Sequence, residues 1–264
     1  MTMKPISEAA AARFDLRGKS VIITGGGKGI GKVYAQEFAR AGARVLTADI
    51  DGEGAEAVAR AIVEEGYEAV GVRTDISDPV SVKAMTQAAL DAFGTIDVLI
   101  NNASLMSVLP RQDWMEIPVE EWDRVMAVNL RGMFLCCHAV APTMKANGHG
   151  KIVNIASSRV FDGTPLRLHY TTSKAGVVGF TRAISRELGP HGVNVNAVSP
   201  GNTQSETQVA SSSGNYLATR VEGRAIARPQ TPLDLVGAVM FLSTQASDFM
   251  TGQTINVDGG KCMH

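Results

Sequence analysis

The chain has 264 residues, of which 45% are hydrophobic, and its 25 basic and 26 acidic residues leave a net charge of -1. A chain of this length can bury the core of one large α/β domain. Charges of both signs are interspersed, with no basic block and no charged tail, so we expect neither a nucleic-acid partner nor a membrane partner.

Residues 1–15 are predicted to be a short, partly loose lead-in, and residues 16–264 a single dinucleotide-binding and catalytic domain. The lead-in lacks an apolar core of signal-peptide length, and no later run approaches a membrane span. The three cysteines are an odd number, and Cys136 and Cys137 are adjacent, so they do not pair easily. We therefore expect a reducing environment and a cytoplasmic location.

Seven short runs rich in β-branched residues are predicted to be strands, with helical spacing between them. This alternation predicts an α/β fold with a single Rossmann-type doubly wound parallel sheet of about seven strands and helices on both faces. Ligands of such sheets bind beyond the carboxyl ends of the strands. The predicted strands are 20–24, 44–48, 68–73, 97–101, 151–155, 193–199 and 254–257, and the predicted helices are 32–42, 51–66, 78–94, 119–147, 170–189 and 231–244.

The glycine-rich stretch TGGGKGIG, residues 24–31, joins the first predicted strand to the first helix. A strict G-x-G-x-x-G fingerprint is absent, and a P-loop is disfavoured because Val33 lacks the hydroxyl that would hold Mg²⁺. The pattern T-G-x-x-x-G-x-G fits, through Gly25, Gly29 and Gly31. Glycines let the backbone approach a ligand closely, and a helix N-terminus attracts an anion, so we expect a pyrophosphate here.

Asp49 ends the second predicted strand, at the distance where an acidic residue commonly binds the adenosine ribose of NAD. A 2′-phosphate at about 4 Å would be repelled by about 4 kcal/mol at an effective dielectric constant near 20. The sequence therefore favours NAD over NADP. Lys28, inside the glycine loop, favours the opposite choice because it would offset a phosphate charge.

Further motifs follow in order: TDIS (74–77), NNAS (101–104), VMAVNL with Asn129, VNIAS with Ser157, YTTSK (170–174), NAVSPG (196–201) and GQTINVDGG (252–260). With these motifs and the glycine loop, the chain resembles the classical short-chain dehydrogenase/reductase family from about residue 16 to about residue 260. Ser157 also lies thirteen residues before Tyr170, as the catalytic serine of that family does before its tyrosine.

Tyr170 and Lys174 are four residues apart on a predicted helix, so their side chains share one face. Lowering the pKa of a phenol from about 10 to neutrality requires about 4 kcal/mol, which one ammonium at about 4 Å would supply. We expect Tyr170 to be the general acid/base and Lys174 to lower its pKa. The resemblance implies that Lys174 also binds the nicotinamide ribose, that Ser157 donates a hydrogen bond to the substrate oxygen and that Asn129 holds a proton-relay water.

The resemblance also implies where the cofactor binds. Two departures from the family pattern weaken parts of that assignment: Ser104 stands where glycine is usual, and Ser205 where threonine is common. The predicted cofactor-binding residues are Gly25, Lys28, Gly29, Ile30, Asp49, Ile50, Asp75, Ile76, Asn101, Asn102, Ala103, Tyr170, Lys174, Pro200, Gly201 and Thr203.

Substrate choice is assigned to two segments, RVFDGTPLRLH after Ser158 and residues 204–228, which we predict to be a substrate lid. His169, beside Tyr170, could touch the mouth of the site. The histidines and cysteines have no metal-ligand spacing, so we predict no metal. Four side chains are candidates for an apolar substrate wall: Phe161, Leu166, Tyr216 and Leu217.

These observations predict an NAD(H)-dependent oxidoreductase acting on a small-molecule secondary alcohol or ketone. An NADPH-dependent 3-ketoacyl-type reductase is the alternative within the same fold. A non-catalytic dinucleotide-sensing protein is the alternative from another class. The resemblance further implies a homotetramer, assembled through the helices near 119–147 and 170–189 and the C-terminal segment.

Overall fold

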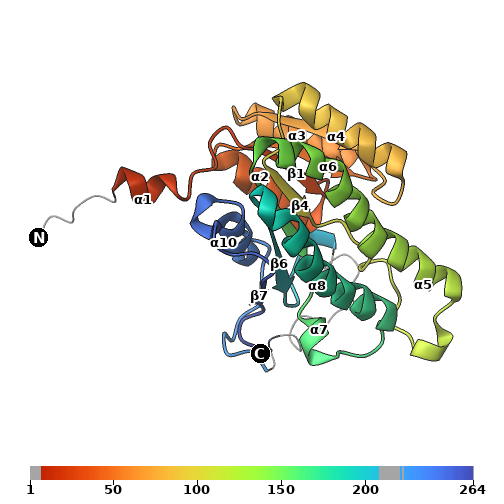
Figure 1. The fold of residues 1–264 in the computed structure, drawn as a ribbon. Helices are drawn as coiled ribbons and strands as arrows, with labels where there is room; N and C mark the ends of the chain where they lie inside the picture. The colour runs from red at the N-terminus through yellow and green to blue at the C-terminus, as the bar shows by residue number, and fades with distance from the viewer. Residues whose placement is uncertain (1–6, 208–220, 222, 264) are drawn as a thin grey trace, which may run out of the picture.

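The computed structural model describes residues 7–207, 221 and 223–263, and its centre is a seven-stranded parallel sheet with the order β3-β2-β1-β4-β5-β6-β7 (Figure 1). The predicted α/β fold is confirmed, with strand bounds that differ from the predicted ones by at most one residue at either end. The strands are β1 Ser20–Thr24, β2 Arg44–Asp49, β3 Ala69–Arg73, β4 Val98–Asn101, β5 Gly150–Ile155, β6 Val193–Pro200 and β7 Thr254–Val257.

Helices cover both faces of the sheet, as predicted. One face packs against α2 (Gly29–Arg40), α3 (Gly52–Glu64) and α10 (Leu233–Leu242), and the other against α4 (Pro79–Phe93), α6 (Met133–Asn147) and α8 (Leu168–Leu188). The remaining helical segments are α1 Glu8–Ala12, η1 Trp114–Glu116, α5 Val119–Met126, the π-helical turn η2 Ala127–Gly132, α7 Arg159–Asp162, η3 Gly189–His191 and η6 Gln245–Ser247.

The two faces are supplied by alternate residues of each strand. In β1, Val21 and Ile23 join the cluster under α2, α3 and α10, whereas Ile22 joins the cluster under α4, α6 and α8. All three side chains are fully buried. Successive side chains of a strand point to opposite faces, so a strand covered on both faces must be apolar at every position, and this explains the run SVIIT.

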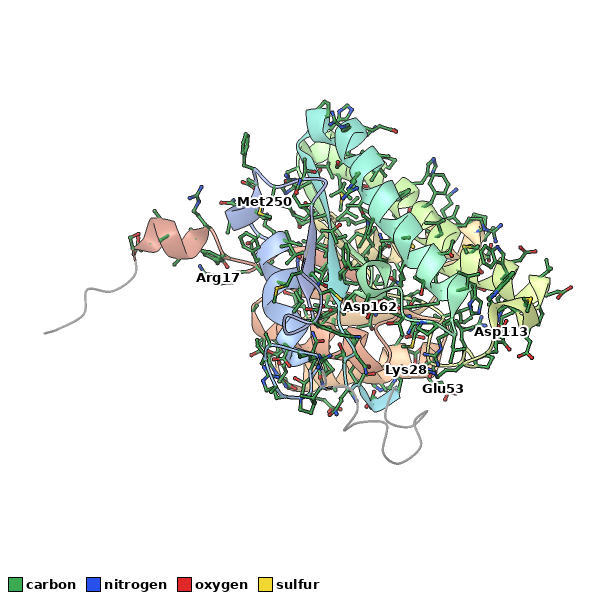
Figure 2. The ribbon with its side chains drawn as sticks, turned by 90° about the horizontal axis from the view of Figure 1, so that it is seen from below. Arg17, Lys28, Glu53, Asp113, Asp162 and Met250 are labelled. Carbon is green, nitrogen blue, oxygen red and sulfur yellow. The ribbon has the colours of Figure 1, made fainter. Side chains whose placement is uncertain are left out.

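The first described residues form a short helix, α1, which the sequence analysis did not predict. Its cap is Ser7, whose hydroxyl accepts a hydrogen bond from the Ala10 amide at 3.3 Å. None of its residues is buried, and Figures 1 and 2 show the helix standing apart from the body of the molecule. Contact with the domain begins at Arg13, whose carbonyl accepts from the Ala246 amide at 2.9 Å.

We expected no run of the chain to approach a membrane span. The helical residues 119–147 correct this expectation, because by length and composition the stretch is long and apolar enough to cross a membrane. Its second half instead packs on the sheet, where Cys136, Cys137 and Met144 are fully buried in the core. A helix that lies against an apolar sheet has to be apolar on the side it buries. All three cysteines of the chain are free.

The topology places a crevice beside the glycine loop. Strand β1 pairs with β2 on one side and with β4 on the other, so the chain order reverses at β1. The loop between β1 and α2 closes tightly there, because a Cβ on Gly31 would lie 2.0 Å from the Gly25 carbonyl oxygen. Only glycine fits position 31. Because the loop carries no side chain there, it packs close to the sheet and leaves space beyond the strand ends.

Candidate active site

A cavity of about 790 Å³ lies beyond the carboxyl ends of the strands, within the usual size range of small-molecule sites. Its wall comes mainly from the ends of β1 to β6, the loops that follow them and α8, with Lys261 after β7. Lys28 and Asp162, two of the wall residues, are labelled in Figure 2. The predicted residues in the wall are Gly25, Lys28, Gly29, Ile30, Asp49, Ile50, Asp75, Ile76, Asn102, Ala103, Ser157, Tyr170, Lys174, Pro200, Gly201 and Thr203.

The glycine loop forms one end of the cavity. Gly25 and Gly29 have φ angles of 66° and 60°, a region that favours glycine, and a Cβ on Gly25 would lie 2.9 Å from Ala103 Cα. The amide of Gly29, at the start of α2, donates to Glu206 Oε1 at 3.0 Å, and Lys32 Nζ lies 3.5 Å from Glu206 Oε2. A carboxylate therefore lies at the helix N-terminus where the sequence predicts a phosphate.

The sequence analysis missed Glu206, although it lies in the predicted lid. One signal in the sequence could have identified this residue: Glu206 is the one acidic residue between Pro200 and Val221. Most of the predicted lid cannot be compared with the structure, because residues 208–220 and 222 lie outside the described residues.

Two carboxylates line the part of the cavity that follows β2 and β3. Asp49 is buried, and its oxygens accept hydrogen bonds from the Gly27 and Asp51 amides, each at 3.0 Å. Asp75 Oδ1 accepts from the Ser77 amide at 2.9 Å and from the Ser77 hydroxyl at 2.6 Å. These bonds hold both carboxylates in place, and each oxygen of Asp49 keeps one lone pair for a ligand.

Tyr170 lies at the other end of the cavity, near Ser157. Each residue is only 7% exposed. Burial raises the pKa of Tyr170, whereas a hydrogen bond with Ser157 and the charges of Arg159 and Arg167 lower it. The net effect is a pKa above the ordinary value of a phenol, so the buried side chain is screened from bulk water and keeps its proton.

Lys174 shares the cavity wall with Tyr170, as their spacing on α8 predicts. Its Nζ donates to the Ile155 carbonyl at 2.7 Å and lies 5.8 Å from the centroid of the Tyr170 ring. Burial lowers the pKa of Lys174 to about 8. The pKa of Tyr170 is raised overall by burial, and the charges that oppose this rise are those of Arg159 and Arg167. Our expectation that Lys174 lowers this pKa is therefore corrected.

Asn129 is absent from the cavity wall, and its role as the holder of a relay water stays a prediction from the sequence. It is 2% exposed and lies in η2. Its Nδ2 donates to the Leu105 carbonyl at 3.2 Å and to Ser173 Oγ at 3.1 Å, and its Oδ1 accepts from the Leu105 amide at 2.7 Å. The side chain therefore fixes the segment after β4, of which Leu105 lines the cavity.

The neighbours Asn101 and Asn102 have different surroundings. Asn101, predicted to line the cofactor, is buried and donates to Asn154 Oδ1 at 2.9 Å and to Cys137 Sγ at 3.3 Å. Asn102 lines the cavity and donates to the Thr24 carbonyl at 3.0 Å. Adjacent residues point to opposite sides, which excludes Asn101 from the wall. Ser104 lines the cavity without a positive φ, so it causes no backbone strain.

The segment after Ser158 contributes polar side chains to the cavity rather than the apolar wall we expected. Phe161 and Leu166 are not in the wall, and Tyr216 and Leu217 lie outside the described residues. The apolar lining comes instead from the segment after β4. The charged and polar wall residues after Ser158 are Arg159, Asp162, Thr164 and Arg167, and the large apolar wall residues after β4 are Leu105, Met106 and Val108.

His169 does not reach the mouth of the cavity. It is fully buried, and its Nε2 lies 3.0 Å from Glu121 Oε1, so it links α8 to α5. Within the described residues, no group of three or more histidine, cysteine or acidic side chains is arranged to hold a metal ion.

Comparison with known proteins finds relatives that are similar in sequence and in fold. The family described as "short chain dehydrogenase" matches residues 19–215. A sorbitol dehydrogenase of Cereibacter sphaeroides is 38% identical, with 94% of this chain and 99% of that protein covered. A 3-oxoacyl-[acyl-carrier-protein] reductase of Synechocystis sp. is 35% identical, with 94% and 98% covered. The crystal structure of a short-chain type dehydrogenase/reductase from Mycobacterium marinum has 34% identity and a TM-score of 0.86, with 95% and 98% covered.

The low pKa of Lys174 predicts a pH-dependent effect on stability. The ordinary value is 10.5 and the folded value is about 8, so between these pH values the unfolded chain binds more protons than the folded chain. The contribution of this side chain to stability therefore rises with pH across that window. Below pH 8 the buried ammonium costs up to about 3 kcal/mol.

We expect Lys174→Met to raise the free energy of unfolding near pH 7 by about 1–3 kcal/mol, and the gain to shrink as the pH approaches 10.5. Urea denaturation of both proteins across this pH range measures the difference. Lys83→Met, at an exposed position on α4, is the control and should change little at any pH. A gain for Lys174→Met that is constant with pH would contradict the argument.

Proposed function

Because the chain belongs to the classical short-chain dehydrogenase/reductase family, whose members are oxidoreductases that use a nicotinamide cofactor, we propose that it transfers hydride between NAD(H) and a secondary alcohol or ketone. The observation that carries the proposal is the buried phenol of Tyr170, hydrogen-bonded to Ser157 in the same cavity as the glycine loop and Asp49. An acid/base group and a dinucleotide cradle are thus joined in one space.

The residues at the glycine-loop end fit a dinucleotide. A side chain at Gly25 or Gly31 would collide with backbone, so the chain keeps an open cradle there. The amide of Gly29 would bind a phosphate oxygen once Glu206 moved away, and Lys32 already faces an anion at this point. Asp49, held by two backbone amides, has lone pairs left to accept from a ribose diol.

The acid/base chemistry is assigned to this chain's own residues. Tyr170 Oη takes the proton of the substrate hydroxyl during oxidation and returns it during reduction, while Ser157 donates a hydrogen bond to the same oxygen. When bound, the nicotinamide accepts or gives the hydride. The Ile155 carbonyl holds Lys174 Nζ in the cavity wall, where it would donate to a ribose hydroxyl of the cofactor. Burial of all three side chains keeps water from the reacting oxygen.

The NADPH-dependent 3-ketoacyl-type reductase is the second candidate. Lys28 supports it, because its exposed side chain lines the cavity at the glycine loop and would face a 2′-phosphate. A relative of that activity is 35% identical. Asp49 opposes it by like-charge repulsion, so we favour NAD. A dinucleotide sensor without turnover would have no use for the Tyr170 and Ser157 pair.

The small-molecule substrate, the cytoplasmic location and the absence of nucleic-acid and membrane partners stay predictions from the sequence. We also propose that the chain forms a homotetramer. Support comes from an apolar patch on α6 and α8, where Phe134 is 47% exposed and its ring centroid lies 6.5 Å from that of Phe180. Exposed aromatic side chains of this kind are enriched at protein interfaces.

Light scattering after size-exclusion chromatography measures the assembly. The chain mass is 27.9 kDa, so the tetramer should elute with about four times that mass, and Phe134→Glu should lower the oligomeric state because a charge would then be buried at the interface. A wild-type protein that elutes at the mass of one chain would contradict the proposal.

Tyr170→Phe is the test of the acid/base assignment. It removes the hydroxyl and keeps the ring, so we expect turnover of a confirmed substrate to fall by about a thousandfold, with the dissociation constant for NADH nearly unchanged. Stopped-flow rates and NADH fluorescence titration measure the two quantities. Tyr67→Phe, on a half-buried tyrosine outside the cavity, is the matched control. Wild-type rates in Tyr170→Phe would disprove the mechanism.

Asp49→Asn is the test of cofactor choice. Removing the negative charge should weaken NADH binding and strengthen NADPH binding, changing the ratio of the two dissociation constants by about tenfold or more. Fluorescence titration with each nucleotide measures the ratio. Asp51→Asn is the control, because Asp51 caps α3 through the Gly54 amide and does not line the cavity. A wild-type protein that binds NADPH more tightly than NADH would favour the second candidate.

A further inference from the structure

Most charged side chains in the cavity wall are grouped by sign. The acidic residues Asp49 and Asp75 follow β2 and β3, at one side of the sheet. The basic residues Arg111, Arg159 and Arg167 come from the segments between β4 and α8, around Tyr170. Asp162 and Lys261, also in the wall, form an ion pair at 2.8 Å. The remaining charged wall residues are Lys28, at the glycine loop, and Lys174, near Tyr170. The end of the cavity that holds Tyr170 is therefore strongly positive.

Arg167 is a buried cation with neutral partners. The residue is only 8% exposed. Nη2 donates to the Leu109 carbonyl at 2.8 Å and Nη1 to Met106 Sδ at 3.6 Å, while Nε is buried without an acceptor. Burial lowers the pKa of this guanidinium, and the charge of Arg111 adds to that effect. No carboxylate of the described chain compensates the charge.

Arg159 has the same character and lies closer to the reacting group. Its backbone amide donates to Ser157 Oγ at 3.3 Å. Its guanidinium donates to the Thr164 carbonyl at 2.6 Å, to the Pro165 carbonyl at 2.9 Å and to Thr171 Oγ1 at 3.3 Å, all of them neutral acceptors. The side chain is half-buried, and desolvation lowers its pKa. These bonds aim the arginine, and the carboxylate of Asp162, which also pairs with Lys261, offsets part of its charge.

Buried charges without a partner are costly, so proteins pair them with an opposite charge from the chain or from a ligand. Here the guanidinium group of Arg167 has only neutral hydrogen-bond partners, and Asp162, the carboxylate that acts on Arg159, is also paired with Lys261. A guanidinium presents parallel N–H groups that match the two oxygens of a carboxylate. A ligand that carries a carboxylate would supply what this end of the cavity lacks.

In our interpretation, the cofactor does not supply the negative charge that this end of the cavity lacks. Its phosphates are assigned to the amides at the start of α2, whereas the charges of Arg159 and Arg167 act on Tyr170, which faces the substrate in the proposed function. Oxidised nicotinamide is itself positive, so its arrival near Tyr170 increases the need for an anion. The anion must then belong to the substrate.

We propose that the substrate is a secondary alcohol or ketone with a carboxylate within a few bonds of the reacting carbon, and that Arg159 and Arg167 bind this carboxylate. This inference rests on the proposed function and names the substrate class for the same site. Both arginines are substrate-binding and specificity-determining residues, which neither the resemblance nor the relatives' names assign.

The first test compares matched pairs of substrates in NAD⁺ reduction. The pairs are 3-hydroxybutyrate with its methyl ester and mandelate with its methyl ester, and glycerol 3-phosphate with glycerol tests a phosphate as the anion. We expect kcat/KM to be about 100-fold or more higher for an acid than for its ester, because the ester leaves the arginines without a counter-charge. Equal or faster turnover of the esters, or a preference for the phosphate, would overturn the proposal.

The second test uses Arg159→Gln and Arg167→Gln, each measured on the plateau of its own pH profile, since loss of either charge also raises the pKa of Tyr170. We expect kcat/KM for the acid to fall by about 100-fold and that for the ester by less than about threefold. Arg167→Lys keeps the charge and should retain part of the acid preference. The control is Arg44→Gln. Arg44 is also a half-buried arginine that donates to carbonyl oxygens, but it is not part of the cavity wall. Equal losses on acid and ester would contradict the assignment.

The outcomes separate this inference from the proposed function. If neither acids, esters nor neutral alcohols reduce NAD⁺, the proposed function fails. In that case thermal unfolding with the same carboxylates still decides the inference, because they should raise the melting temperature of the wild type and not that of the double glutamine variant. If turnover occurs without acid preference and the carboxylates give no protection, this inference alone fails.

Discussion

The close approach of the glycine loop to the strand ends is the contact on which the site depends. A Cβ on Gly31 would lie 2.0 Å from the Gly25 oxygen, and a Cβ on Gly25 would lie 2.9 Å from Ala103 Cα. With side chains at these positions the loop would lift away from β1 and β4, and the start of α2 would shift with it. The cavity exists because backbone, without side chains, closes one end of it.

Electrostatics decide how the rest of the cavity is used. The folded chain places the amine of Lys174 and the guanidinium groups of Arg159 and Arg167 close to the phenol of Tyr170. Burying these groups costs stability, since desolvation lowers the pKa of each cation. Strain of this electrostatic kind is expected where a protein must bind a charged ligand or move a proton, and it is uncommon in a merely structural core. The glycine-loop end behaves similarly, since Glu206 provides an anion for the helix N-terminus.

Local pattern was sufficient to predict the sheet. The runs rich in β-branched residues, with helical spacing between them, predicted all seven strands to within one residue at either end, because strand and helix periodicity are properties of neighbouring residues. The shared face of Tyr170 and Lys174 was predicted for the same reason. The short helices α1 and α7 were missed, since five and four residues carry too little periodicity.

Thus the sequence by itself determined the α/β fold, the glycine cradle and the residue types available for acid/base chemistry, through spacings that act over one turn or one strand. The tertiary structure alone decided which side chains meet. It turned Asn101 into the core and Asn102 toward the cavity, engaged Asn129 with Leu105 and Ser173, and brought Arg159 and Arg167 beside Tyr170. These outcomes depend on contacts between segments far apart in the chain, and on which polar groups burial leaves without a partner. Neither quantity is carried by the spacing of residues along the sequence.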